Sequence, residues 1–431
     1  MSGNFIISFN WLPREYGNII ERLTFADLFI SVDSYCLTEL ADQLAKTVRR
    51  GPRVSLYLLA QWFVANWWRL RWEPERPKEL SWLMSHKIGA AGSGYCWPDL
   101  SFCSDGWAVT IHGQPTQTLE SQMVRYLQSV DINIPVIEFE QEVDSFVDAM
   151  INRLASEAPA ETELASLWKE VLQERRDPQL TEWRKLEAFL GYDPDEAPGK
   201  VVEALIGSKK FYGAGAIEEM AVASMDKALS DIESLWNDAR PAALQITVPN
   251  STVLRNRIQK DVQPSPFSWQ RAKEAAKIAR MAWSIKPGPI SNKEFFEILE
   301  LNAGTIDNMN FFSTPVTAGF RENACMDSVK VLVNKRTISG QRFALARLLA
   351  DHLNTDQSER LLPACDTATQ RQKFQRAFAQ EFLCPFEDMI YFGGNKFNDE
   401  AIEALADQFI VSPLLVRTTL VNNNVLERAC L

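Results

Sequence analysis

Residues 341–355 read QRFALARLLADHLNT, and this stretch sets the fold of the last part of the chain. Its leucines, Leu345, Leu348, Leu349 and Leu353, recur at the spacing that gathers side chains on one face of an α-helix. Charged and polar residues lie between them. The pattern predicts an amphipathic helix that buries its leucine face in a core.

The segments around this helix predict a small sheet and two further helices. Residues 314–323 and 327–336 are rich in β-favouring side chains and are expected to form two paired strands. Apolar residues recur at steps of three and four in 268–283 and in 371–385, so both segments are expected to be helical, with Ser268 as the N-cap of the first.

The first 135 residues combine predicted strands and helices, and they hold eight of the 13 tryptophans. Residues 38–50 predict a short helix ending in basic side chains. Residues 54–72 predict one longer helix that carries four of the tryptophans. Since aromatic side chains at helical spacing usually pack inward, we expect an aromatic core in this region.

Residues 136–262 are predicted to be mainly helical, because apolar side chains repeat at steps of three and four through most of them. The segment 248–268 is polar and flanked by prolines, which is typical of a linker. At 431 residues the chain is long for a single core, so two or three domains are expected.

Composition narrows the classes of function. A formal net charge of −11 disfavours a general nucleic-acid binder, which needs clustered Lys and Arg. The seven cysteines are scattered without a CxxC pair, as is typical of reduced thiols in the cytoplasm. Polar side chains interrupt the most apolar window, 54–72, and the start lacks the pattern of a signal peptide. We expect a cytoplasmic protein without a membrane span.

The order of these elements resembles the ImmA/IrrE family of bacterial and phage-linked zinc peptidases. The resemblance covers residues 266–427, and each of its pieces is similar to a family segment. The pieces are AKEAAKIARMAWSIKPGPIS (272–291), VLVNKRTISGQRFALARLLADHL (331–353), FQRAFAQEFLCP (374–385) and ALADQFIVSPLLVRTTLVN (404–422). The resemblance implies a zincin-like α+β domain at this end of the chain.

Family members carry HExxH on the active-site helix, where the two histidines hold zinc and the glutamate polarises the bound water. Matched position by position, Arg347 replaces the first histidine, Leu348 the glutamate and Asp351 the second histidine. His352 comes one residue later, rotated by about 100° around the helix, so it is poorly placed to substitute.

The third family ligand is an acidic residue near the start of the next helix, where this chain has Gln372 and Lys373. A guanidinium is always protonated and has no lone pair to give a metal. Arg347 is instead expected to form an ion pair with Asp351, four residues away on the same helix.

The expected fold class is therefore α+β with three parts: an aromatic-rich N-terminal α/β domain (1–135), a helical middle (136–262) and a degenerate zincin-like α+β domain (263–431). The resemblance implies a pseudo-peptidase without metal or other cofactor. It would bind another protein, such as a repressor, toxin or phage component, in bacterial stress, mobile-element or phage-defence control. His352 and Glu381 are candidate binding residues beside the altered metal positions.

Two other functions remain open. The first is an enzyme whose site lies in residues 82–112, or else a structured turn in the same place; its candidate side chains are His86, Tyr95, Trp97, Asp99 and Asp105. The second is a DNA-binding regulator that uses the helix-turn-helix pattern in 404–420, with Arg417 on its second helix. Packing beside the peptidase-like helix is the other interpretation of that pattern.

Overall fold

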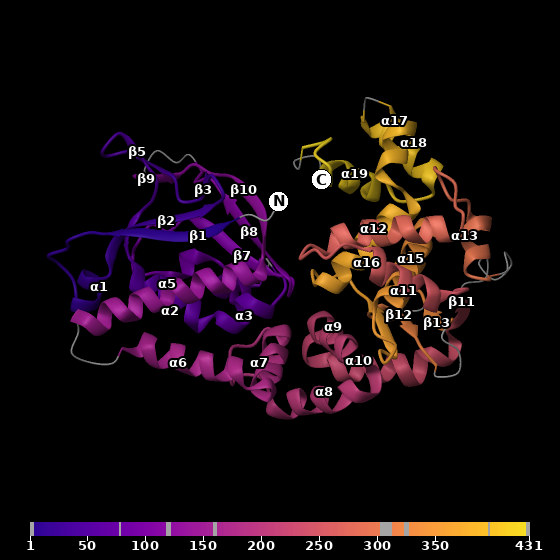
Figure 1. Ribbon diagram of the computed structural model, residues 1–431, viewed down its shortest axis with the longest axis horizontal. Coiled ribbons are helices and arrows are strands. Elements are labelled where there is room, and N and C mark those ends of the chain that lie inside the picture. Colours follow the sequence, from indigo (N-terminus) through magenta and orange to yellow (C-terminus); the bar gives the residue numbers. More distant parts are fainter. Residues whose placement is uncertain are drawn as a thin grey trace. The chain divides into compact units, whose positions relative to one another are not determined.

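The structure is a computed structural model that describes residues 4–76, 79–117, 122–157, 162–301, 313–322, 327–394 and 397–427 (Figure 1). The fold class is α+β, with many helices and small antiparallel sheets. The chain divides into two compact units, Met1–Val202 and Glu203–Leu431. The helices expected within 136–262 are shared between these units.

Among its described residues, the first unit contains three small sheets and seven complete α-helices, besides the short 3₁₀-helix Ile88–Ala91. One sheet has the order β1-β2-β3, with β6 also paired to β2; the others have the orders β5-β4-β9 and β10-β8-β7. The strands are β1 (Phe5–Trp11), β2 (Phe25–Val32), β3 (Tyr35–Cys36), β4 (Leu40–Asp42), β5 (Thr47–Arg49), β6 (Arg53–Ser55), β7 (Asp99–Ser104), β8 (Ala108–Gln114), β9 (Val124–Tyr126) and β10 (Val130–Pro135). The helices are α1 (Ile19–Leu23), α2 (Leu56–Ala65), α3 (Trp67–Trp72), α4 (Leu80–His86), α5 (Val136–Glu157), α6 (Glu163–Arg176) and α7 (Pro178–Leu190).

An aromatic core holds this unit together. Of the four tryptophans in 54–72, Trp62, Trp67 and Trp68 are buried, as their helical spacing predicts, and Trp72 is partly buried against the same core; Trp82 is also buried. Phe63 lies among further rings at centroid distances of about 6 Å, typical of edge-to-face and tilted packing. The expected aromatic core is therefore present.

Two local predictions for this unit are wrong. Residues 38–50 form β4, a turn and β5 instead of a helix. The Asp42 side chain accepts hydrogen bonds from the amides of Leu44 and Ala45 at 3.1 and 3.0 Å, and this turn competes with helix formation. Residues 54–72 form β6 and then two helices, which are interrupted at Asn66.

The second unit contains one four-stranded sheet of order β11-β13-β12-β14 and helices around it. Helix α8 (Gly199–Tyr212) runs across the boundary between the two units. The strands are β11 (Leu244–Thr247), β12 (Thr317–Phe320), β13 (Ser328–Leu332) and β14 (Leu361–Ala364). The other helices are α9 (Ala214–Ser224), α10 (Ala228–Ser234), α11 (Ser251–Asp261), α12 (Ser268–Ala282), α13 (Asn292–Ile298), α15 (Ile338–Asn354), α16 (Gln370–Leu383), α17 (Phe386–Gly393), α18 (Asp399–Phe409) and α19 (Pro413–Asn422).

Helix α15 is the centre of this unit, and it is the helix that residues 341–355 predict. Its first turn is capped by Thr337, whose hydroxyl accepts from the Gly340 amide. Its four predicted core leucines are buried to within 1% exposure. The helix packs on β12, β13 and β14 and against α16, which also contacts α12 (Figure 1). The strand prediction also holds, since β12 and β13 pair antiparallel.

The segment expected to be a linker contains helix α11. Its Leu254 and Ile258, four residues apart, are buried against the core of the unit. The Arg255 guanidinium donates to the backbone carbonyls of His352 and Thr355 at the end of α15. The predicted cap is also displaced, because Phe267 is the N-cap of α12 and Ser268 is its first helical residue.

Among the described residues no single helix is long and apolar enough to cross a membrane. Helices α18 and α19 reach that length and composition only as a pair, and they are bent by 111° relative to each other.

Replacing Leu349 by alanine tests whether α15 is the centre of the core. We expect a loss of about 2–5 kcal/mol of unfolding free energy, because a fully buried leucine would leave a cavity. Urea denaturation monitored by circular dichroism measures it. The control is Leu414→Ala on α19, where the side chain is 63% exposed and the loss should stay below about 0.5 kcal/mol. Equal losses in both variants would contradict this role.

Candidate functional site

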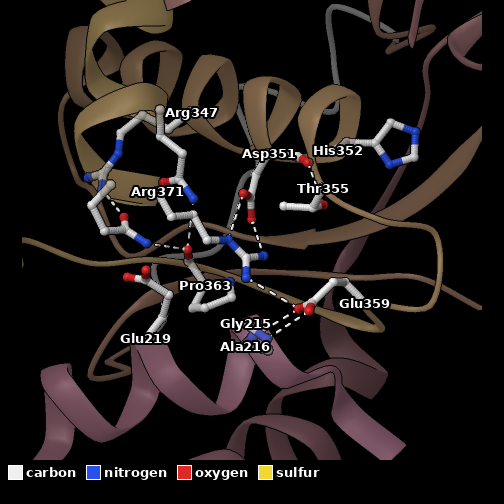
Figure 2. Close-up of polar contacts among 12 residues, drawn as sticks. Gly215, Ala216, Glu219, Arg347, Asp351, His352, Thr355, Glu359, Pro363 and Arg371 are labelled. Carbon is white, nitrogen blue, oxygen red and sulfur yellow. Dashed lines mark hydrogen bonds and ion pairs between the residues drawn. The ribbon is translucent and has the colours of Figure 1, made fainter. Parts of the chain in front are cut away.

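The positions that resemble metal ligands lie in a buried network of charged side chains (Figure 2). Asp351 of α15 is 1% exposed and accepts two hydrogen bonds from Arg371, the second residue of α16. Nε of Arg371 reaches Oδ1 at 2.8 Å and Nη2 reaches Oδ2 at 2.7 Å. This two-pronged geometry is the strongest form of guanidinium–carboxylate contact.

The predicted ion pair between Arg347 and Asp351 is wrong. Nη2 of Arg347 donates instead to the carbonyl of Cys365 and, at 2.6 Å, to Oε1 of Gln372. The Asp351 carboxylate already accepts two hydrogen bonds from the planar guanidinium of Arg371, which approaches it from the neighbouring helix. An arginine on the same helix as its carboxylate gains only a single weak pairing.

The other candidate residues that the resemblance suggests lie in packing or hydrogen-bonding contacts within the fold. Leu348 is fully buried in the core. The backbone carbonyl of His352 accepts a hydrogen bond from Arg321 at 2.7 Å. The ring nitrogen Nδ1 of His352 lies 3.3 Å from Nε of the same arginine. Glu381 lies near the opposite end of α16 from Arg371, and burial raises its pKa. Glu381 is therefore not part of the network around Asp351.

The same network covers the outer edge of strand β14. The carbonyl of Pro363 accepts from the side-chain amides of Gln372 and Gln375, both at 3.0 Å. The amide of Cys365 donates to Oε1 of Gln372 at 3.0 Å. A peptide that added to this edge as another strand would have to displace these bonds. Gln372 and Gln375 are three residues apart, so both side chains lie on one face of the helix. This spacing was the signal in the sequence from which their shared contact could have been predicted.

Two carboxylates tie helix α9 to this network. Glu359 accepts from the amides of Gly215 and Ala216 at 2.7 and 2.9 Å, at the positive end of the α9 dipole, and also pairs with Arg371 at 3.2 Å. The N-cap Gly213 has φ +109°, and a Cβ there would lie 2.5 Å from the Glu359 carboxylate. Sequence reasoning missed this contact because Glu359 and α9 are far apart in the chain.

Glu219 of α9 is the second of these carboxylates. Its Oε2 accepts from the hydroxyl of Thr369 at 2.8 Å, and Thr369 is also the N-cap of α16. Burial raises the pKa of Glu219 to about 7. Its charge therefore changes near neutral pH.

His86, from the segment 82–112, lies in a separate buried network in the first unit. Its Nδ1 is 2.7 Å from the carbonyl of Phe102 and its Nε2 is 3.0 Å from Glu73, while its ring stacks on Trp82. Arg69 also donates to Glu73 at 2.7 Å. Burial alone would raise the pKa of Glu73, but the hydrogen bonds from His86 and Arg69 outweigh it and lower that pKa.

The other four candidates of that segment each have a local partner. The hydroxyl of Tyr95 accepts from an arginine near the start of the chain, and the Trp97 indole donates to the carbonyl of Gly92 at 2.9 Å. Asp99 pairs with a lysine at 2.8 Å, and Asp105 accepts two backbone amides of its own turn. These contacts are typical of a structured turn.

The predicted helix-turn-helix corresponds to α18 and α19, whose bend of 111° lies in the range of that motif. Much of α19 is buried, including Leu415, Val416, Thr419 and Leu420. The Arg417 guanidinium pairs at 2.8 Å with Asp399 of α18. The second helix is therefore engaged mainly in packing.

Comparisons with protein-family models, curated proteins and solved structures gave no match to the chain. In the described part of the chain, no group of three or more His, Cys, Asp or Glu side chains is arranged to hold a metal ion.

Replacing Asp351 by alanine tests the buried ion pair. We expect a loss of about 3–5 kcal/mol, because Arg371 would keep an uncompensated buried charge. Changing both residues, in Asp351→Leu with Arg371→Met, should cost less than Asp351→Ala alone. Chemical denaturation of the variants measures the coupling. As a control, Asp399→Ala breaks an exposed pair and should cost under about 1 kcal/mol. Additive effects at 351 and 371 would rule out the coupling.

Glu219 predicts a pH dependence of stability. Its pKa is about 7 in the folded protein against an ordinary value of 4.5, so between these values only the folded state keeps the proton. Stability contributed by this group is present at low pH and falls as the pH rises from about 4.5 to about 7. Glu219→Gln should therefore be more stable than the native chain by about 1–3 kcal/mol above neutral pH.

Melting temperatures measured from about pH 5 to pH 8 test this dependence. The advantage of Glu219→Gln should shrink toward the acid end. Glu387→Gln changes an exposed carboxylate of α17 and serves as the control with no such trend. A difference between Glu219→Gln and the native chain that does not vary with pH would exclude this titration.

Proposed function

We propose that the second unit is an ImmA/IrrE-like pseudo-peptidase that binds another protein and does not hydrolyse peptide bonds. The observation that carries the proposal is that Arg347 and Asp351, at the positions that resemble the two zinc-binding histidines, are buried, and that Asp351 is paired with Arg371 of the next helix. A metal site needs lone pairs at these positions, and guanidinium groups supply none.

The pair also supports the proposal by what it does for the fold. Through Arg371 it joins α15, α16 and the Glu359 carboxylate, so these elements are held together by side chains of the chain itself. At the position resembling the general base, Leu348 belongs to the core and has no proton to exchange. The arrangement preserves a peptidase-like framework without catalytic groups.

The proposed partner is a protein of the same cell, such as a repressor, toxin or phage component, and the proposed location is the cytoplasm of a bacterium. The role follows the resemblance: control of stress, mobile elements or phage defence. Because Gln372 and Gln375 occupy the Pro363 carbonyl of β14 and Arg347 donates to the Cys365 carbonyl just beyond it, this partner would bind without adding a strand at that edge.

Metal content and peptidase activity test the proposal. The purified full chain should contain no stoichiometric zinc by elemental analysis and cleave no peptide library with added Zn²⁺ or Mn²⁺. A variant with Arg347→His, Leu348→Glu, Asp351→His and Gln372→Glu supplies the ligand types and should gain zinc affinity if the resemblance is right. Stoichiometric zinc in the native chain that disappears in Asp351→Ala would overturn the proposal.

Binding is tested with the purified products of the adjacent genes. At least one should bind the full chain with a Kd below about 10 μM in calorimetry. The absence of binding by all of them would count against a role in such an operon.

A further inference from the structure

Two guanidinium groups converge on the short loop 365–369 that leads into α16. Arg347, from α15, donates to the carbonyl of Cys365. Arg376, from the second turn of α16, reaches back and donates to the carbonyl of Thr367 at 2.8 Å. Figure 2 shows the Arg347 side chain extending away from the Asp351–Arg371 pair.

The position of these two cations differs from that of Arg255, Arg280 and Arg321, which are also buried in this unit. Arg255 and Arg321 donate to carbonyls at the carboxyl end of α15, and Arg280 donates to the Phe382 carbonyl at the carboxyl end of α16. The helix dipole favours cations at those ends. Arg347 and Arg376 lie instead near the amino end of α16, where the dipole disfavours a positive charge.

Their charges are also weakly compensated. Arg347 is only 4% exposed, and its ion pair is with Asp366 at 3.7 Å, whose side chain is 87% exposed and screened by water. Nε of Arg347 has no hydrogen-bond partner among the residues that the structure describes. Burial and the charge of Arg376 together lower the pKa of Arg347 to about 10.

The neighbouring carboxylates are engaged elsewhere. Asp351 and Glu359 both contact Arg371, which is thereby neutralised. Glu219, which acts electrostatically on Arg376, accepts its hydrogen bond from Thr369 and carries only part of a negative charge near neutral pH. An anion at the start of α16 would complement both guanidinium groups and the helix dipole at once.

We propose that Arg347 and Arg376 form a binding site for a small, doubly charged oxyanion of the phosphate class. Two guanidinium groups match the charge of such a group, and their N–H donors match its oxygen atoms. The anion could be free phosphate or a phosphate group carried by another molecule. The site does not depend on the proposed function, because it requires only these two side chains and the start of α16.

Titration calorimetry of the full chain with inorganic phosphate, at constant ionic strength held with NaCl, tests the site. Arg376→Gln should weaken phosphate binding at least about tenfold, since it removes one charge-assisted contact. Arg417→Gln removes a guanidinium elsewhere in the unit and should bind as the native chain does. Arg376→Gln should also melt no lower than the native chain without phosphate, because it relieves repulsion with Arg347, so lost binding would not reflect unfolding.

Further ligands separate the possible sources. Tighter binding of O-phosphoserine than of inorganic phosphate would support a phosphate carried by another molecule, and equal or weaker binding would support the free ion. Acetate binding as strong as that of phosphate would overturn the proposal. So would equal phosphate affinity in Arg376→Gln and Arg417→Gln, or no binding beyond that of chloride.

Discussion

The second unit depends on one interaction, the buried contact between the Asp351 carboxylate and the Arg371 guanidinium. Burying two charges is costly, and the cost is offset only when the contact has good geometry and the remaining donors are satisfied. Here two hydrogen bonds of 2.8 and 2.7 Å join the pair, and Glu359 takes a third donor of Arg371. Since Glu359 also holds the first amides of α9, one ionic cluster fixes the relative positions of three helices.

Around this pair, neutral side chains add further hydrogen bonds. Gln372 links the Arg347 guanidinium, the Pro363 carbonyl and the Cys365 amide, and Gln375 shares the same carbonyl. A network of this kind is stable only when its members have partners, because an unpaired polar group is expensive in a core. It also occupies the Pro363 carbonyl of β14, one of the groups through which a peptide could add to the sheet.

The first unit also contains a buried carboxylate with charged partners, formed by different residues. Glu73, fully buried, is shared by Arg69 and His86, and His86 is held in place by a backbone carbonyl and by the Trp82 ring. In both units a buried carboxylate joins separate elements of the fold through hydrogen bonds, in addition to hydrophobic packing. At the start of α16, by contrast, the ion-pair partner of Arg347 is the exposed Asp366, and Arg376 donates to a backbone carbonyl.

The sequence by itself determined the elements with strong local patterns. The leucine spacing predicts α15, the β-rich segments predict the pairing of β12 and β13, and tryptophans at helical spacing predict the aromatic core. The tertiary structure decided which side chains far apart in the sequence pair with each other, because local patterns do not contain that information. The partner of Asp351 came from another helix and not from Arg347, four residues away, because a bidentate contact in the core outweighs a weak pairing along one helix. In the same way, burial of Leu254 and Ile258 made a helix of a polar segment that reads locally as a linker.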